Sequence, residues 1–478
     1  GRRLGEVAIM ARQREQIDVV NPEDKLDFKK IMPIFVIVLI DLLGLTIIIP
    51  LMALYATSFG ADAFTIGLLG AAYPIMQFIG APLLGRLSDR YGRKPILLVS
   101  QIGTLIGFIV LGLAGSLPLL FIARLIDGLS GANISTAQAV ITDSTTARTR
   151  TQGLGLLGAA FGLGFVVGPV LAFLSLAISN NNYHVPAFVA AGFSAISIGL
   201  TWFWLEETHG PEKRGTDPVK GVFSIGAIFK ALSHPTVGLL LLLMFAQQIA
   251  FGGFEQILAL FTLNRLGMNA SSNSILFVFV GIIVVAVQDG LIGKWSRKWG
   301  DRKLVYIGLA TLAIGMALTA LTPSQTLPGY SKAELTAELT HDSNFRTHET
   351  PVTRELPVAI PEDGNSGPGG LVWLLVAMIP ASIGGGVLQP SINSLITKRI
   401  APSEIGGTLG ISAALLSGAN VFAPLIGGGL FQAGGSSLPF WVWAIIMAAL
   451  LAAAYMLIKP GREEQAPSGL ARGGAAAH

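Results

Sequence analysis

A few charged side chains lie inside long apolar stretches of the sequence, where they could bind a proton or a cation. Asp41 lies about ten residues into the stretch that begins near Ile31. At about 1.5 Å per helical residue, its carboxyl group would lie roughly 15 Å deep, near the middle of a bilayer. An ionised carboxylate is costly there, so we expect it to face a wet cavity, pair with a cation or be protonated. Asp41 is therefore a candidate for proton binding or cation recognition; the alternative is a structural hydrogen bond to a neighbouring helix.

A second pair of charges lies in another apolar stretch. Arg124 and Asp127 are three positions apart, so on a helix they share a face and could neutralise one another. An arginine beside a carboxylate favours the deprotonated acid, so moving that arginine toward another acid would change the affinity for the proton.

The elements that carry these charges must be membrane helices. Of the 478 residues, 52% are hydrophobic and 13% are charged, about half the charged share of a soluble domain. Stretches of about 20 apolar residues can cross the hydrocarbon core. We predict twelve, near 31–55, 63–85, 95–115, 118–140, 152–177, 185–205, 236–262, 272–293, 303–322, 370–391, 404–431 and 437–458.

The composition also excludes several kinds of chemistry. There is no cysteine, so disulfides, thiolate metal sites and cysteine nucleophiles are ruled out. The phosphate-binding pattern GxxxxGK[ST] is absent, which argues against direct ATP hydrolysis. No nucleophile, metal-ligand cluster or acid pair with catalytic spacing is apparent. We therefore expect no cofactor, no metal and no enzymatic activity, and an intramembrane enzyme is the least favoured interpretation.

The basic residues predict the orientation. They concentrate in alternate loops and in both tails, which would be cytoplasmic by the positive-inside rule. The N-terminal residues show no cleavable signal peptide, so the first apolar stretch should remain as a helix. We predict a multi-pass protein of the cell (inner) membrane with both termini in the cytoplasm.

The sequence also repeats. GRLSDRYGRK at 85–94 corresponds to GKWSRKWGDRK at 293–303, an offset of 208, whereas GPV from Gly168 corresponds to APL from Ala423, an offset of 255. The difference, 47 residues, is nearly the length of an acidic polar segment that lies between the two markers in the second half only. That segment is either a passive loop or a functional element, such as a lid or a partner-binding site. The predicted parts are a cytoplasmic tail (1–30), a six-helix bundle (31–208), a cytoplasmic linker (209–235), a second bundle (236–460) with an external insertion (322–369), and a cytoplasmic tail (461–478).

The charged motif after the second stretch is a candidate cytoplasmic gate. Gly85 would permit close helix approach, Asp89 could lie at a helix N-terminus, and Arg90 and Arg93 could hold the bundles together. The alternative is basic anchoring on the cytoplasmic side. In the second copy Arg297 replaces Asp89, so the two gates would not be equivalent.

Four signatures together resemble the major facilitator superfamily, and within it the twelve-helix drug:proton antiporters such as the tetracycline-resistance efflux proteins. They are DLLGLTIIIP at 41–50, GRLSDRYGRK at 85–94, RLIDG at 124–128 and GLGFVVGP at 162–169. The resemblance covers nearly all of 33–458 except the insertion. It implies an all-α integral membrane protein with twelve transmembrane helices in two pseudo-symmetric six-helix bundles.

The resemblance also implies roles for single residues. Arg124 matches an arginine associated with proton coupling, whereas the family often has an uncharged residue at the position of Asp127. Gly164, Gly168 and Pro169 match the antiporter motif of the fifth helix, which would seal the bundles together in one conformation; glycines there also allow close packing, and the proline bends the helix.

Polar side chains within the stretches are candidates for substrate contact or, alternatively, for hydrogen bonds between helices. They are Gln77, Asn133, Gln138, Gln247, Gln248, Glu255, Gln288, Gln389 and Asn393. We expect Glu255 to lie toward the external end of its helix as a hydrated carboxylate. The third and ninth stretches lack the acidic residues of tetracycline exporters, which argues against tetracycline itself as the substrate.

Together these features predict a proton-coupled antiporter that exports small amphipathic drugs or similar compounds by alternating access. Its partners would be a small-molecule substrate, protons and the lipid bilayer, with no nucleic acid, and the chain would be a monomer. A metabolite or lipid transporter of the same fold remains an alternative. So does a non-transporting receptor or scaffold that uses the external loop.

Overall fold

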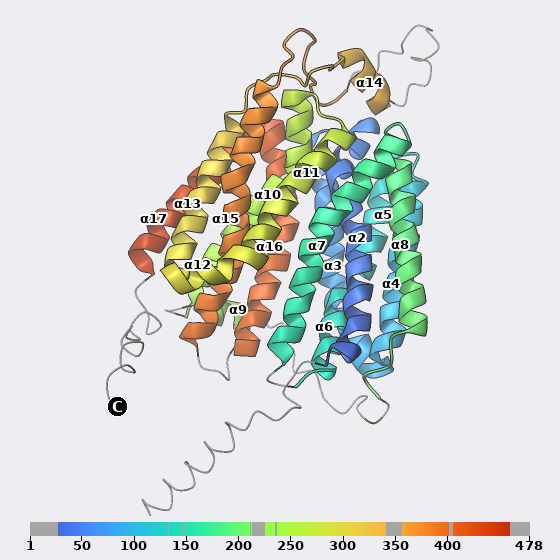
Figure 1. Cartoon of the computed structure of the whole chain (residues 1–478), viewed down its shortest axis with the longest axis vertical. Helices are drawn as coiled ribbons and strands as arrows, with labels where there is room; N and C mark the ends of the chain where they lie inside the picture. The colour runs from blue at the N-terminus through green and yellow to red at the C-terminus, as the bar shows by residue number, and fades with distance from the viewer. Residues whose placement is uncertain are drawn as a thin grey trace, which may run out of the picture.

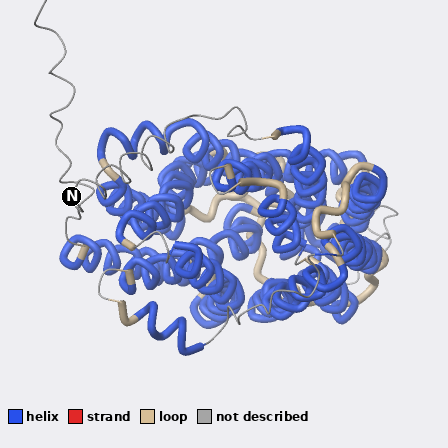
Figure 2. The backbone as a smooth tube through the Cα atoms, turned by 90° about the horizontal axis from the view of Figure 1, so that it is seen from below, coloured by secondary structure: helices blue, strands red, loops and turns tan. Residues whose placement is uncertain are grey.

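A computed structural model describes residues 27–131, 133–146, 149–210, 212, 225–234, 237–340, 356–400 and 405–458. Most of the two predicted tails and of the linker, and the middle of the insertion, lie outside these residues. Within them the chain forms twelve helices long and apolar enough to cross a membrane, as predicted. Figure 1 shows them side by side along the long axis of the molecule, and Figure 2 shows them closer to end-on.

The first six spans form one bundle. They are α2 (Phe28–Ser58), α3 (Ala63–Tyr91), α4 (Arg93–Gly112), the pair α5 (Leu117–Ser130) and α6 (Asn133–Asp143), α7 (Arg150–Ile178) and α8 (His184–Phe203). The fourth predicted span is thus two consecutive helices, the first of which ends just before Gly131.

The last six spans form the second bundle, preceded by the short helix α9 (Ile225–Leu232). They are α10 (Gly238–Leu266), α11 (Ala270–Val285), α13 (Asp301–Ala320), α15 (Gly369–Arg399), α16 (Ile405–Gly434) and α17 (Leu438–Leu457). After α11 the chain continues through a π-helical segment, η3 (Ala286–Leu291), into α12 (Ile292–Trp299), so this span extends past its predicted end.

The insertion contains the helix α14 (Lys332–Thr340), and its two limbs are tied together. Thr326 N donates to Asn365 O at 3.0 Å, and Gly367 N donates to Thr326 O at 2.9 Å. Figure 1 places α14 above one end of the bundles, which we call the insertion end. The opposite end, which carries α6 and α9, we call the motif end because the α3–α4 turn lies there.

Local signals fix the helix boundaries. The Asp62 carboxylate accepts a hydrogen bond from Thr65 N at 2.8 Å and caps α3. Gly267 ends α10 in the left-handed conformation, with φ of 64°. Gly92 and Gly300, which correspond in the repeat, both have positive φ, 109° and 78°, and each joins two helices at a sharp turn.

The largest apolar core joins the two bundles. It includes Ile48 and Leu51 of α2 together with Phe254 and Leu258 of α10, all at most 2% exposed. A separate cluster, which includes Ile34, Leu97 and Val140, lies within the first bundle. The buried apolar contacts between the two bundles therefore lie mainly away from the motif end.

Candidate functional site

A small pocket in the first bundle brings several candidate residues together. It has a volume of about 20 Å³, and its lining includes Asp41 of α2, Tyr73 of α3, Thr104 of α4 and Asp127 of α5. That volume accommodates about one water molecule. Two of the three residues predicted for proton coupling therefore face the same small cavity, which is otherwise lined largely by apolar residues.

The third, Arg124, contacts the pocket through two of its lining residues. Arg124 Nη1 lies 3.0 Å from Asp127 Oδ2, and the guanidinium carbon lies 4.6 Å from the centre of the Tyr73 ring. Asp127 is only 3% exposed. In this conformation Arg124 and Asp127 neutralise one another within α5, and the aromatic face adds a cation–π contact.

Asp41 is held by a residue that is not among the candidates predicted from the sequence. Gln101 Nε2 donates to Asp41 Oδ2 at 3.3 Å and to Ser197 Oγ at 2.8 Å, which links α2, α4 and α8. Gln101 is fully buried. It is a polar residue inside an apolar stretch, the same signal that selected Gln77, and could have been found by it.

Glycines bring α5 close enough to form this site. A Cβ atom at Gly107 of α4 would lie 2.9 Å from Asp127 Cβ, and one at Gly128 would lie 2.4 Å from Tyr73 O. Gln77 donates from Nε2 to the Tyr73 hydroxyl at 3.3 Å and to Gly131 O at 3.1 Å. Gln77 thus holds Gly131, the residue that follows α5, next to the pocket.

The other predicted substrate contacts are dispersed. Gln138 is exposed on α6, and the side chain of Asn133 lies outside the described residues. In the second bundle Gln248 donates to Asn420 Oδ1 at 2.8 Å, and Asn393 Oδ1 accepts from Ser412 Oγ at 3.4 Å. Gln247 is buried, Gln389 is partly buried, and Gln288 lies in the π-helical segment.

Glu255 is deeper than expected. The helix α10 continues through Asn264 and Arg265 to Leu266 because Gly267 caps it there. Glu255 is consequently eleven residues from the helix end, about 16 Å along the axis. The expectation of a carboxylate near the end of its helix was wrong, because the predicted span stopped four residues too early.

At the motif end Arg93 is the centre of a charge cluster. Its guanidinium lies 2.5 Å from Asp89 and 3.0 Å from Asp143, and it also donates to Ser88 Oγ at 2.7 Å. Glu207 accepts from Arg93 N at 2.9 Å. These partners all belong to the first bundle and its C-terminal end, so in this conformation Arg93 holds one bundle together.

The remaining motif residues make fewer contacts. Arg90 stacks on Tyr91, 5.3 Å from the ring centre. A Cβ atom at Gly85 would meet nothing within 4 Å, so the close helix approach expected at Gly85 is not present in this conformation.

The fifth span, α7, packs against both bundles. A Cβ atom at Gly168 would lie 2.0 Å from Thr46 Oγ1, and one at Gly164 would lie 3.3 Å from Leu42 Cβ. Thr46 Oγ1 donates to Gly164 O at 2.9 Å. On its other side a Cβ at Gly281 of α11 would lie 2.7 Å from Phe165 O. Gly164 and Gly168 therefore seat α7 on α2, next to the buried Pro169.

The bundles are joined tightly at the insertion end. A Cβ atom at Gly67 of α3 would lie 2.4 Å from Pro424 O of α16, and one at Gly428 would lie 2.5 Å from Ala63 O. Glu338 of α14 accepts from the Tyr183 hydroxyl at 2.9 Å and from Asn181 Nδ2 at 3.0 Å. The insertion thus binds the first bundle, and the structure is closed at this end.

The sequence model of the Major Facilitator Superfamily matches residues 34–332 and 366–476. The chain belongs to this superfamily. The stretch left unmatched, 333–365, falls within the insertion, which agrees with the offset of 47 between the two repeat markers. Membership confirms the resemblance and identifies the chain as a transporter rather than an enzyme.

Curated relatives of this superfamily transporter include resistance proteins. The chain is 27% identical over 419 residues to the tetracycline resistance protein, class B, of Escherichia coli, covering 86% of this chain and 91% of the relative. It is 25% identical over 396 residues to multidrug resistance protein 1 of Bacillus subtilis, covering 82% and 87%.

Solved structures share the fold. The human organic anion transporter MFSD10 (TETRAN) is 21% identical, with a TM-score of 0.58, and the match covers 92% of this chain and 100% of that chain. The nucleoside transporter NupG is 14% identical, with a TM-score of 0.66, and the match covers 91% and 100%. At these identities the likeness supports the architecture of two six-helix bundles and says nothing of the substrate.

Proposed function

We propose that this transporter is a proton-coupled antiporter that exports small amphipathic compounds from the cell. The names of its relatives, which are tetracycline and multidrug resistance proteins, support this class of substrate. The observation that carries the proposal is the shared pocket, where Asp41 and Asp127 face one small cavity and Arg124 binds one of the two acids.

This geometry supports a mechanism for coupling. When Arg124 lies 3.0 Å from Asp127, that acid is compensated and Asp41 is the other acidic group of the pocket available to bind a proton. A shift of Arg124 toward Asp41 would reverse these roles, because a cation stabilises the ionised form of whichever acid it approaches. Rocking of the bundles would drive that shift, since α2 contacts α10 and α11 of the second bundle, whereas α5 packs on α3 and α4 of its own bundle.

We infer that the insertion end faces outward, because the basic loops and tails lie at the other end. Closure at Gly67 and Gly428 and the latch at Glu338 then make this conformation inward-facing. The Arg93 cluster would contact the second bundle only in the opposite, outward-facing conformation, when the motif end closes.

The test is transport of fluorescent cationic dyes and antibiotics into inverted vesicles with an imposed proton gradient. We expect Asp41→Asn to lose gradient-driven uptake. Asp62→Asn is the matched control, because Asp62 caps α3 outside the pocket and asparagine caps a helix equally well. Wild-type uptake by Asp41→Asn would refute the assignment of Asp41, and no uptake of any compound by the wild type would favour the metabolite, lipid or scaffold alternatives.

A further inference from the structure

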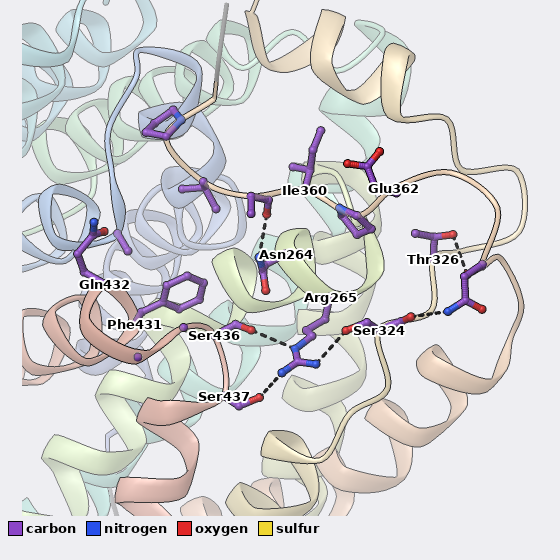
Figure 3. A pocket seen from close by; sticks show the side chains of 18 of the residues that line it. Asn264, Arg265, Ser324, Thr326, Ile360, Glu362, Phe431, Gln432, Ser436 and Ser437 are labelled. Atoms are coloured by element: carbon purple, nitrogen blue, oxygen red, sulfur yellow. Dashed lines mark hydrogen bonds between the residues drawn. The ribbon is translucent and has the colours of Figure 1, made fainter.

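A second and much larger pocket lies at the insertion end, outside the central site. Its volume is about 870 Å³, within the range of small-molecule sites. One wall is the end of α10, a second is the turn between α16 and α17, and the insertion forms the remainder (Figure 3). Ala63, from the first bundle, completes the lining.

The insertion is anchored where it forms this pocket. Asn264 Nδ2 donates to Ala359 O at 2.8 Å, and Asn365 Nδ2 donates to Ser324 O at 2.7 Å. The Tyr330 hydroxyl donates to Pro361 O at 2.7 Å, and Val358 is only 4% exposed. Hydrogen bonds and a buried apolar residue thus fix the returning limb, so the pocket has a defined shape.

Arg265 carries the positive charge of the pocket. Its Nε donates to Ser436 Oγ at 3.0 Å, its Nη1 to Ser324 Oγ at 2.9 Å and its Nη2 to Ser437 Oγ at 2.6 Å, as Figure 3 shows. A guanidinium has five N–H donors, of which the described residues occupy three and leave two. Hydroxyls orient the group without cancelling its charge, since they are neutral.

The acidic residues of the same pocket both contact Lys332 of the insertion. Lys332 Nζ lies 2.6 Å from Glu362 Oε1 and compensates its charge, whereas Asp363 Oδ1 accepts from the neutral Lys332 N at 2.8 Å. Glu362 is largely exposed on the rim. Among the described residues that line this pocket, Arg265 is therefore the basic residue that is held in place without an acidic partner.

We propose that this pocket binds an amphipathic organic anion, with its carboxylate or phosphate on Arg265. Two free N–H donors on a planar, pre-oriented guanidinium match the two oxygens of such a group. Ile360, which is partly buried, lines the pocket and supplies apolar surface for the rest of the ligand, with the buried Phe431 and Val358 behind it.

Binding would depend on the conformation of the transporter, and this part rests on the proposed alternating access. Ala63 belongs to α3, which crosses α16 at the closed insertion end. The pocket loses this wall when α3 and α16 separate. An anion bound from outside therefore stabilises the inward-facing state, as any ligand favours the state that binds it better.

Hexyl phosphate and hexanoate are suitable soluble probes, and hexanol is the neutral control of equal chain length. Isothermal titration with the purified protein should detect both anions and not hexanol. Arg265→Gln should weaken their binding by at least about tenfold, because a charge-assisted hydrogen bond is lost. Arg302→Gln is the matched control, since Arg302 lies at the motif end and its guanidinium bonds to Ile458 O.

A second variant distinguishes loss of the binding site from misfolding of Arg265→Gln. Ala359→Trp leaves Arg265 in place but fills the pocket from an exposed position, and it should also abolish binding. Equal binding of hexanol, or wild-type affinity in both variants, would overturn the proposal. Native mass spectrometry with phosphatidylglycerol separates the sources: Arg265-dependent retention of that lipid identifies a lipid headgroup as the anion, and its absence, with hexyl phosphate still bound, identifies a soluble one.

The pocket shares no lining residue with the central site, so the two proposals can fail separately. Asp41→Asn should still bind hexyl phosphate, even though it should not transport. A chain without proton coupling can therefore still bind the anion, and a chain that does not bind the anion can still export.

Discussion

Arg93 and Asp143 form an ion pair at the motif end of the first bundle, with Nε and Oδ2 3.0 Å apart, and the second bundle contains the same pair with its charges exchanged. The two offsets of the sequence repeat, 208 and 255, take Arg93 to Asp301 and Asp143 to Lys398. Asp301 Oδ2 and Lys398 Nζ lie 2.5 Å apart.

The exchange extends to the neighbours of this pair. Ser88, which accepts from Arg93, corresponds to Ser296, which donates to Asp301. Asp89, the second partner of Arg93, corresponds to Arg297. The repeat has therefore kept the positions of the interacting residues while reversing the charges, which indicates that the contact between two helix ends matters more than its sign.

Reversing the first cluster should consequently preserve it. Arg93→Asp alone places three acids together, the new one with Asp89 and Asp143, and should cost about 1 to 2 kcal/mol, since Asp143 keeps a fifth of its side chain exposed and the charges are partly solvated. The triple variant Asp89→Arg, Arg93→Asp and Asp143→Lys should recover wild-type thermal stability and most of the transport rate.

The control for this series is the double variant without Asp89→Arg, which should recover only part of the loss because Asp89 would then repel the new acid. Thermal unfolding of the purified proteins measures the stability of the single, double and triple variants. A triple variant as unstable as Arg93→Asp would show that the sign of the charge is fixed by a contact outside this cluster.

The sequence could predict the membrane spans because apolar length and turn residues are local properties. Gly92 and Gly300, for example, mark equivalent turns in both halves. It could not predict that Asp143 lies beside Arg93, because that contact depends on how α6 returns to the α3–α4 turn. The depth of Glu255 was missed because α10 continues through the polar pair Asn264 and Arg265, which resembles the end of a span.

The central site shows the same limit. Asp41, Arg124 and Asp127 were selected because charge inside an apolar stretch is costly, and this argument needs only the sequence. That Gln101 is the residue that holds Asp41 depends on the relative rotation of α2 and α4. Likewise, only the fold reveals that Glu338, one of several acids in the insertion, is the acid that reaches Tyr183.

Gln101 should be needed to position Asp41. Gln101→Leu removes its hydrogen bonds to Asp41 and Ser197 and should lower gradient-driven transport about tenfold, at a cost of about 1 kcal/mol in stability per lost bond. Ser197→Ala keeps the bond to Asp41 and should transport at nearly the wild-type rate. Equal losses in both variants would indicate a purely structural role for Gln101.

Closure at the insertion end should depend on the external pH through Glu338. Burial raises the pKa of the Glu338 carboxyl above its ordinary 4.5, against the lowering effect of hydrogen bonds from Tyr183, Asn269 and Asn181. The closed state therefore binds the proton more tightly than the open state. It is stabilised as the pH falls from the raised pKa toward 4.5, and it loses this stabilisation as the pH rises past the raised pKa.

Because the chain has no cysteine, a single Ala63→Cys reports this closure by its reaction with an impermeant thiol reagent. Labelling should increase with pH more steeply in the wild-type background than in Glu338→Gln, which remains neutral and keeps only the increase due to ionisation of the thiol itself. Glu334→Gln, on the exposed side of the same helix, is the control and should keep the wild-type pH profile. A pH profile unchanged by Glu338→Gln would remove Glu338 from the closure.

The close crossing of α3 and α16 leaves no room for a side chain at Gly67. The Cβ of Gly67→Ala would lie 2.4 Å from Pro424 O and 3.1 Å from Gly428 Cα. Both are backbone atoms, which cannot move aside as a flexible side chain can, so the two helices must separate. We expect labelling of Ala63→Cys to rise at least about tenfold, as a shift of about 1.4 kcal/mol toward the open state requires, and transport to fall. Gly192→Ala, on α8 with nothing within 4 Å of its new Cβ, should leave both unchanged. Wild-type labelling and transport in Gly67→Ala would mean that α3 and α16 do not meet this closely during the transport cycle.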